Sequence, residues 1–247
     1  MYVEPASWTD VASVETDLAV LPVGATEQHG PHAPLGTDTL TASAVAEAGV
    51  SRFDGEVVVA PAVPLGVSEE HRHFPGTMWL TPETFRAVVR DAVRSLSSHG
   101  FDRVVVVNGH GGNVAPLREV TARLTRDDEA YVVPFTWFDA VGEHTSEMGH
   151  GGPLETAMLR AIDPDLVYDD RLDAASADAA DGWGEWVSHV NLAYDVAEFS
   201  DNGVVGDPAD GDAERGRVLL EMAGSALARL LTAVDERDLD GGPRTRA

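Results

Sequence analysis

The chain is organised around residues 18–38, which read LAVLPVGATEQHGPHAPLGTD. The apolar run Leu18 to Val23 predicts a short buried strand. Glycines and prolines then interrupt regular structure, so Glu27, His29 and Asp38 fall in a loop after that strand. In open α/β sheets, ligands bind at the carboxyl ends of the strands, where this loop begins. Carboxylates and imidazoles are side chains that hold zinc- or manganese-type ions. The segment indicates a strand that leads into either a metal-binding loop or a polar loop with chance donors.

The composition narrows the class of protein. The 247 residues include 42 acidic and 17 basic ones, with a formal net charge of -25, no cysteine and no lysine. Such a surface repels nucleic acid and anionic membranes, and any metal must be held by nitrogen and oxygen. Without a long apolar run or a signal pattern, we expect a cytoplasmic protein. The spread of acidic residues and the absence of lysine favour a halophilic protein over an ordinary acidic one.

Strands and helices alternate along the sequence. The expected strands are 18–23, 56–61, 104–107 and 131–138. The expected helices are 39–46 with Asp38 as a possible cap, 81–99, 115–124, 154–162 and 213–234. Residues 169–182 are expected to form a surface loop, and 187–196 can hold strands. This order predicts an α/β fold, a three-layer sandwich with a mostly parallel central sheet and helices on both faces. We expect one domain over 1–247, with an N-terminal arm at 1–17 and a frayed tail at 237–247.

Donor-rich loops follow all four predicted strands. They are residues 24–38, 66–77, 108–113 and 142–152. Because a parallel sheet places such loops along one edge, their convergence favours a metal or catalytic centre over unrelated surface loops.

Five separated motifs resemble those of the creatininase (creatinine amidohydrolase) family. They are Glu27-Gln28-His29-Gly30-Pro31-His32 with Asp38, Ser68 with Glu70-His71 and Phe74-Pro75-Gly76-Thr77, Asn108 to Asn113, His150-Gly151-Gly152 with Glu155-Thr156, and Gly203 to Pro208. They occur in order over roughly residues 18–235. The resemblance implies a creatininase-like fold and an amidohydrolase with two divalent ions per chain, zinc or manganese, with iron as a further option.

The resemblance also implies roles for individual residues. Glu27, His29, Asp38 and His110 match metal ligands, with Asp38 bridging the two ions, and His150 matches the histidine that handles the proton. Creatinine hydrolases carry a further glutamate ligand two residues after the position of His110, where this chain has Gly112. Glu155 is the expected replacement, as a ligand and a catalytic residue. Gly112 argues against creatinine itself as the substrate.

Several residues near these motifs are candidate substrate contacts. They are Ser68, Glu70, His71, Gly111, Gly112 and Trp137. Glu70 and His71 are equally consistent with structural roles. Trp137 and Trp183 are more often core residues than substrate platforms, although both lie near the candidate loops.

The donor set suggests a chemistry. Two neighbouring divalent ions activate water and polarise a carbonyl, and a histidine such as His150 can protonate a leaving nitrogen near neutral pH. We expect hydrolysis of a non-peptide C–N bond in a small cyclic amide or formamide. The alternatives are a formamidopyrimidine deformylase of archaeal flavin or deazaflavin synthesis, a peptidase that trims a modified precursor peptide of the mycofactocin type, and a metal-free binding protein on the same fold. The resemblance further implies a homo-oligomer, a hexamer built as a trimer of dimers.

Overall fold

A four-stranded parallel sheet forms the centre of the computed structural model, which describes residues 1–239. In the order β2-β1-β3-β4, its strands are β1 (Leu18–Val23), β2 (Val58–Val59), β3 (Arg103–Asn108) and β4 (Tyr131–Thr136). Val23 pairs with Asn108, and Asn108 pairs with Thr136. These three strands end level with one another, so the loops that follow them leave from one edge of the sheet.

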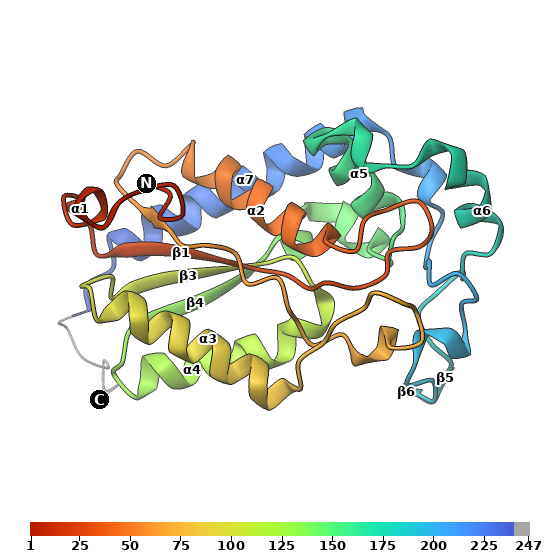
Figure 1. Cartoon of the computed structure of the whole chain (residues 1–247), viewed down its shortest axis with the longest axis horizontal. Coiled ribbons are helices and arrows are strands. Elements are labelled where there is room, and N and C mark those ends of the chain that lie inside the picture. Colours follow the sequence, from red (N-terminus) through yellow and green to blue (C-terminus); the bar gives the residue numbers. More distant parts are fainter. Residues whose placement is uncertain (240–247) are drawn as a thin grey trace.

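Helices cover both faces of the sheet, which confirms the predicted three-layer α/β fold (Figure 1). One face carries α2 (Thr37–Val50), α5 (Pro153–Ile162) and α7 (Ala213–Asp235), and the other carries α3 (Pro82–Ser97) and α4 (Val114–Arg126). Side chains of a strand alternate between the two faces. Val105 and Val107 therefore pack with the α7 side, while Val104 and Val106 pack with the α3 and α4 side.

Local sequence explains where the helices begin. Thr81 caps α3 by accepting a hydrogen bond from the Thr84 N–H, and Pro82 occupies the first helical position, where its missing N–H costs nothing. Asp212 caps α7 in the same way through the Arg215 N–H. The predicted boundaries of these helices are confirmed to within a few residues.

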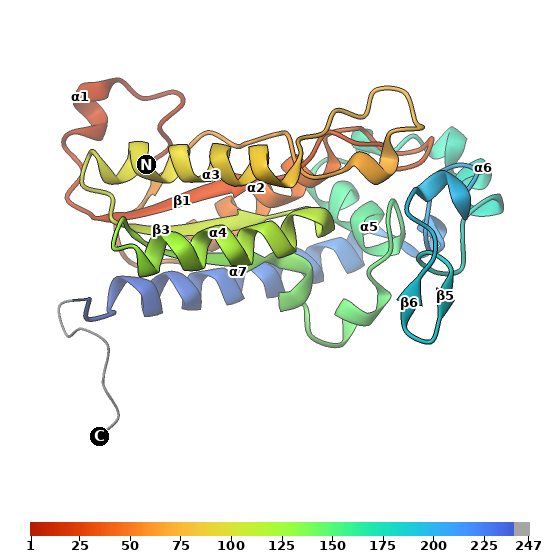
Figure 2. The ribbon, with the colours of Figure 1, turned by 90° about the horizontal axis from the view of Figure 1, so that it is seen from below.

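The structure corrects the sequence predictions in two places and bears out the strands expected around 187–196. The strand expected at 56–61 is paired only at Val58–Val59. The segment 169–182 is not all loop, because it contains α6 (Leu172–Ala177). Within 187–196 the chain forms a short hairpin of β5 (Trp186–Val187) and β6 (Val190–Asn191), which lies at the same end of the molecule as α6 (Figure 2).

The N-terminal arm lies against the sheet. It contains the short helix α1 (Trp8–Val11), which begins with a capping box between Ser7 and Asp10. The Val3 N–H donates to the Val59 carbonyl, which joins the arm to β2. Of the predicted tail, residues 240–247 lie outside the described residues. Over residues 1–239, none of the helices combines the length and the apolar character needed to cross a bilayer.

The described residues also contain short 3-10 helices. They are Glu69–His71, Gly111–Asn113, Trp137–Ala140, Gly142–Glu147, Pro164–Leu166, Asp169–Arg171, Val196–Glu198 and Pro208–Asp210.

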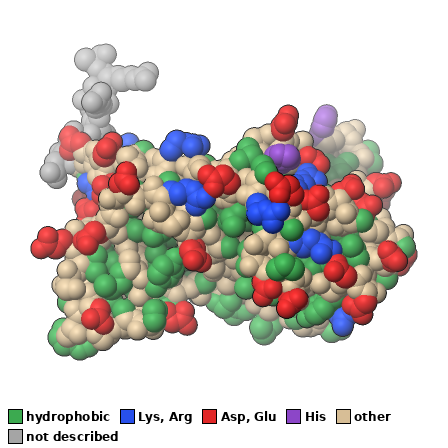
Figure 3. Space-filling view, turned by 90° about the horizontal axis from the view of Figure 1, so that it is seen from above, with side chains coloured by type: hydrophobic (Ala, Val, Ile, Leu, Met, Phe, Trp, Pro, Cys, Tyr) green, Lys and Arg blue, Asp and Glu red, His purple; other side chains and the backbone are tan. Residues whose placement is uncertain are grey.

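The acidic surface leads to a prediction about salt. Carboxylates are spread over the face shown in Figure 3 among fewer arginines, and the formal net charge is -25. The Debye length falls from about 10 Å at 0.1 M salt to about 3 Å at 1 M, so molar salt screens most of this repulsion. We expect the thermal midpoint to rise between these concentrations in potassium chloride. A flat or falling midpoint in melting curves would contradict a halophilic protein.

Candidate metal centre

Six side chains from separate parts of the sequence meet at the carboxyl edge of the sheet. Glu27 and His29 come from the loop after β1, Asp38 from the first turn of α2, His110 from the loop after β3, and His150 and Glu155 from the start of α5. All six are buried, with at most 5% of their surface exposed. The predicted convergence of the loops is therefore present in the structure.

One group of donors contains Glu27, Asp38 and His110. The Nδ1 atom of His110 lies 3.2 Å from Glu27 Oε1 and 3.3 Å from Asp38 Oδ2. Ligand atoms of the three residues all lie within 4.8 Å of one another. Two carboxylates and one imidazole at these distances could hold one divalent ion.

A second group of donors contains His29, His150 and Glu155, whose ligand atoms all lie within 4.8 Å of one another, and Asp38 lies next to this group. The Nε2 atom of His29 is 3.1 Å from Asp38 Oδ1 and 3.5 Å from Glu155 Oε1. Asp38 thus directs one oxygen to each group of donors, which is the arrangement a bridging carboxylate needs.

Asp38 is not the cap of α2, in contrast to the alternative considered from the sequence. The N-cap position is Gly36, no side chain caps this end, and Asp38 already lies within the helix. Its Oδ2 atom is buried without a hydrogen-bond partner. The carboxylate is therefore directed at the histidines.

Hydrogen bonds to backbone carbonyls orient three of the histidines. His29 donates from Nδ1 to the Glu27 carbonyl at 3.2 Å. His110 donates from Nε2 to the Val67 carbonyl at 2.7 Å, and His150 donates from Nε2 to the Gln28 carbonyl at 2.5 Å. When these rings are neutral, each carries its single proton on the nitrogen that faces the carbonyl, so the inward nitrogen can offer a lone pair, as in metal-binding histidines.

The charges of the site call for a cation. Glu27, Asp38 and Glu155 are buried carboxylates, and across residues 1–239 no arginine forms an ion pair with any of them. Both oxygens of Glu27 also lack hydrogen-bond partners. Their ion-pair partners are histidines, and burying three carboxylates close together is costly unless cations compensate them. The residues present therefore fit a pair of divalent ions.

The pKa values show how these groups respond without a cation. Burial raises the pKa of Glu27 to about 7. Burial alone would lower the pKa of His29 and His110, but the neighbouring carboxylates raise both above the ordinary value. The pKa of His150 is lowered by its burial and by the adjacent His29. The raised pKa values of Glu27, His29 and His110 therefore favour their protonated forms in the absence of a cation.

Competition between protons and metal gives a prediction about pH. Binding must displace the protons on Glu27, His29 and His110, so lowering the pH adds competitors and weakens binding. We expect the affinity for zinc to fall about tenfold per pH unit for each proton released, as the pH drops below about 7. Competition with a chromophoric chelator measures this affinity. An affinity independent of pH in this range would show that these side chains are not the ligands.

The structure gives a physical reason why this chain has Gly112 where creatinine hydrolases carry a glutamate ligand. A Cβ atom there would lie 2.1 Å from the Val67 carbonyl oxygen, so a glutamate cannot be placed without moving the backbone. Glu155 places a carboxylate beside His29. The Gly151 N–H donates to its Oε2 at 2.6 Å, which leaves Oε1 facing His29.

A cavity of about 740 Å³ opens onto the donors. Of the predicted substrate contacts, it is lined by Glu70, His71, Gly111 and Gly112. Ser68 and Trp137 are not among its lining residues. Both are fully buried, and Trp137 packs in the core against Phe138 with ring centroids 5.6 Å apart. In this structure the cavity does not reach these two predicted contacts.

Sequence reasoning missed two residues of the site. Trp183 lines the cavity and stands edge-on to the His150 ring at 6.0 Å, but its segment has no periodic pattern that could place it. Gln28 lies between two donors in the sequence, and its side chain makes three hydrogen bonds, two of them buried. The alternation of side chains along an extended segment could have shown that Gln28 points away from Glu27 and His29.

The chain is similar to known proteins of one family. The family profile Creatininase, described as creatinine amidohydrolase, matches residues 4–231. A mycofactocin precursor peptide peptidase of Mycolicibacterium smegmatis is 37% identical over 219 residues, covering 86% of this chain and 84% of the relative. The creatinine amidohydrolase of Pseudomonas putida is 32% identical over 180 residues, covering 63% and 68%. The solved structure "Creatininase Mn" superimposes with a TM-score of 0.79 and 25% identity, covering 96% of this chain and 99% of that one.

Proposed function

This chain belongs to the creatininase family, and from that premise we propose that it is an amidohydrolase with two divalent metal ions per chain. The proposed ligands are Glu27, Asp38 and His110 for one ion, and His29, Asp38 and Glu155 for the other. The observation that carries the proposal is the position of Asp38, with one oxygen toward each group. Zinc and manganese suit imidazole and carboxylate ligands, and iron is a further option.

The protein side chains have separate tasks in this proposal. When bound, the ions would activate water and polarise the carbonyl of the substrate. His150 has an unprotonated Nδ1 directed into the site and a pKa lowered by burial. It can take a proton at Nδ1 and pass it to the leaving nitrogen. Trp183 and Glu70 line the cavity in which the substrate would lie.

A precursor-peptide peptidase is a second candidate, favoured by two observations. The relative from Mycolicibacterium smegmatis carries that name and covers most of the chain. The cavity of about 740 Å³ also lies within the size range of pockets that bury drug-sized ligands, so it has room for the end of a peptide. This chain has Gly112 where creatinine hydrolases are expected to carry a glutamate. Creatinine is therefore the weaker choice of substrate.

Turnover by the metal-loaded protein tests the proposal. Creatinine, a formamidopyrimidine and short peptides should be compared in molar salt, with the His150→Gln variant as the blank. Hydrolysis of an amide that requires both His150 and added metal is the expected result. Release of formate would identify a deformylase, and release of a terminal peptide fragment would identify the peptidase. A native protein that binds one of these compounds tightly without turnover would instead be a binding protein.

We also propose a hexamer, in line with the resemblance. Trp186, Val190 and Tyr194 around the β5–β6 hairpin are 59%, 59% and 85% exposed, which suits an interface. Light scattering in molar salt should give about six times the chain mass of 26.2 kDa. Trp186→Ser should reduce that mass, whereas Trp8→Ser on α1, whose side chain is 80% exposed, should not. A native protein that scatters as a single chain would exclude the hexamer.

A further inference from the structure

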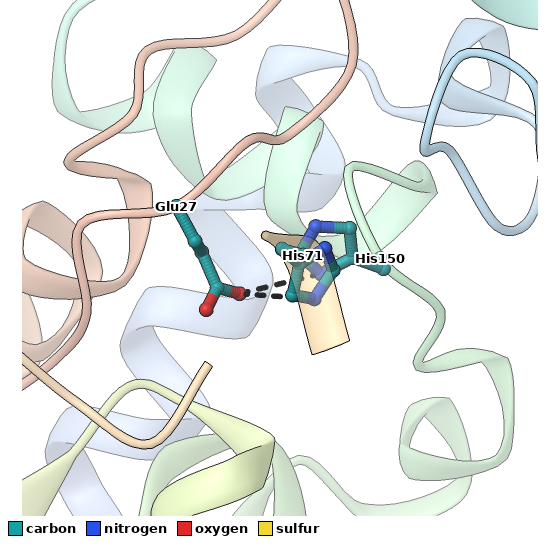
Figure 4. Close-up of side chains that lie close together, drawn as sticks. All are labelled: Glu27, His71 and His150. Carbon is teal, nitrogen blue, oxygen red and sulfur yellow. Dashed lines mark ion pairs between the residues drawn. The ribbon is translucent and has the colours of Figure 1, made fainter. Parts of the chain in front are cut away.

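Glu27, His71 and His150 form a third group that has the appearance of a metal site (Figure 4). The Nε2 atom of His71 and the Nδ1 atom of His150 each lie 3.6 Å from Glu27 Oε1. The two rings stack with centroids 4.1 Å apart, and all three residues are buried. Whether His71 can bind an ion depends on which of its ring nitrogens carries the proton.

The side-chain amide of Gln28 is held in one orientation. Its Oε1 accepts a hydrogen bond from the Gly30 N–H at 2.8 Å, so this atom is the oxygen. Its Nε2 donates to the Gly203 carbonyl at 2.9 Å, which only an N–H can do. Exchanging the oxygen and nitrogen would break both bonds, so the orientation follows from the hydrogen-bond network.

The backbone at Gly203 leaves room for this amide. Gly203 has a φ of +82°, and a Cβ atom there would lie 2.1 Å from Gln28 Oε1. Gln28 therefore joins the loop after β1 to the loop around Gly203 and to the turn that holds His71.

The fixed amide determines the tautomer of His71. The second N–H of Gln28 Nε2 points to His71 Nδ1 at 2.8 Å, so Nδ1 accepts and carries no proton. A neutral imidazole with a bare Nδ1 has its proton on Nε2. That atom faces Glu27, and a protonated nitrogen has no lone pair for a metal. His71 thus has the opposite arrangement to His29, His110 and His150, whose inward nitrogens are bare when the rings are neutral.

We propose that His71 is a positioning residue that donates its Nε2–H to the Glu27 carboxylate, and that Gln28 imposes this role by fixing the tautomer. His71 Nε2 and both Glu27 oxygens are buried without other hydrogen-bond partners. Their separation of 3.6 Å is about 0.4 Å too long for a hydrogen bond, so the proposed bond requires the two side chains to approach, and the cost of leaving both groups unpaired favours that approach. The inference rests on the proposed function, because it assigns His71 to orient a ligand of the first ion. It predicts two ions per chain and no third.

The test combines nitrogen NMR with zinc binding. The protein, with histidine labelled by ¹⁵N, is studied before and after loading with zinc, and His71→Gln identifies the His71 signals. We expect a protonated Nε2 and a bare Nδ1 for His71 in both states. In Gln28→Glu the new carboxylate accepts from His71, so the proton should move to Nδ1.

Zinc affinity distinguishes positioning from ligation. His71→Leu should weaken one of two zinc sites by about 10- to 100-fold, as loss of a hydrogen-bond partner of a ligand does. His71→Gln, which keeps a donor, should restore most of this affinity, and the matched control His73→Leu, at an exposed position two residues away, should change nothing. A bare Nε2 on His71, a third zinc ion, or native affinity in His71→Leu would overturn the inference. If the native protein bound no zinc, the proposed function would fail, whereas the NMR signals would still report the tautomer.

Discussion

Replacing Asp38 with alanine should remove both metal ions from the purified protein and abolish turnover. The reason is that Asp38 directs Oδ1 at His29 and Oδ2 at His110, so a single carboxylate serves both groups of donors. Removing a residue that hydrogen-bonds to a metal ligand lowers the affinity for the metal by about 10- to 100-fold. Removing a ligand that both ions share should lower the affinity of each site by more than that. Metal analysis and zinc titration measure the effect.

Thermal stability provides a second measure of the same change. Zinc at about 100 times its dissociation constant should stabilise the native protein by about 2.7 kcal/mol, since it binds only the folded state. The Asp38→Ala variant should gain almost nothing. Asp54→Ala, at an exposed position, is the matched control and should respond to zinc like the native protein. If Asp38→Ala retained two tightly bound ions, Asp38 would not bridge them.

Replacing Glu155 with glutamine should empty one metal site and leave the other filled. The glutamine keeps the size of the side chain and can still accept from the Gly151 N–H, so the fold at the start of α5 should persist. It removes the negative charge that faces His29. We expect one ion per chain, held by Glu27, Asp38 and His110, and loss of most activity because the chemistry needs two ions.

The alternative role of Glu155 predicts a different result. A carboxylate in the first turn of a helix interacts favourably with the helix dipole, and its loss costs only about 0.3–1 kcal/mol. If that were its main role, Glu155→Gln would keep two ions and lose a little stability. Glu143→Gln, an exposed change in the preceding turn, controls for the removal of one charge. Metal content therefore separates the two roles.

The sequence allowed the layers of the fold and most of the donors to be predicted. The run Val104 to Val107 is buried on both faces, as its continuous β-branched pattern predicted. The loops after β1 and β3 converge because parallel strands end at one edge, so Glu27 and His110 could be paired without coordinates. Their roles as ligands remain predictions.

Other features depended on contacts that the sequence does not reveal. Trp137 follows a strand at the correct edge, yet it faces the core, because the turn after β4 directs its ring toward Phe138. Trp183 has no regular element around it, so its place in the cavity follows only from tertiary packing. The tautomer of His71 depends on Gln28 and Gly203, which are 175 residues apart in the sequence.

Anomalous diffraction from crystals soaked in zinc or manganese tests the central claim most directly. The account predicts two peaks per chain on opposite sides of the Asp38 carboxylate, one beside Glu27 and His110 and the other beside His29 and Glu155. A single peak, no peak, or two peaks that do not share Asp38 would contradict it.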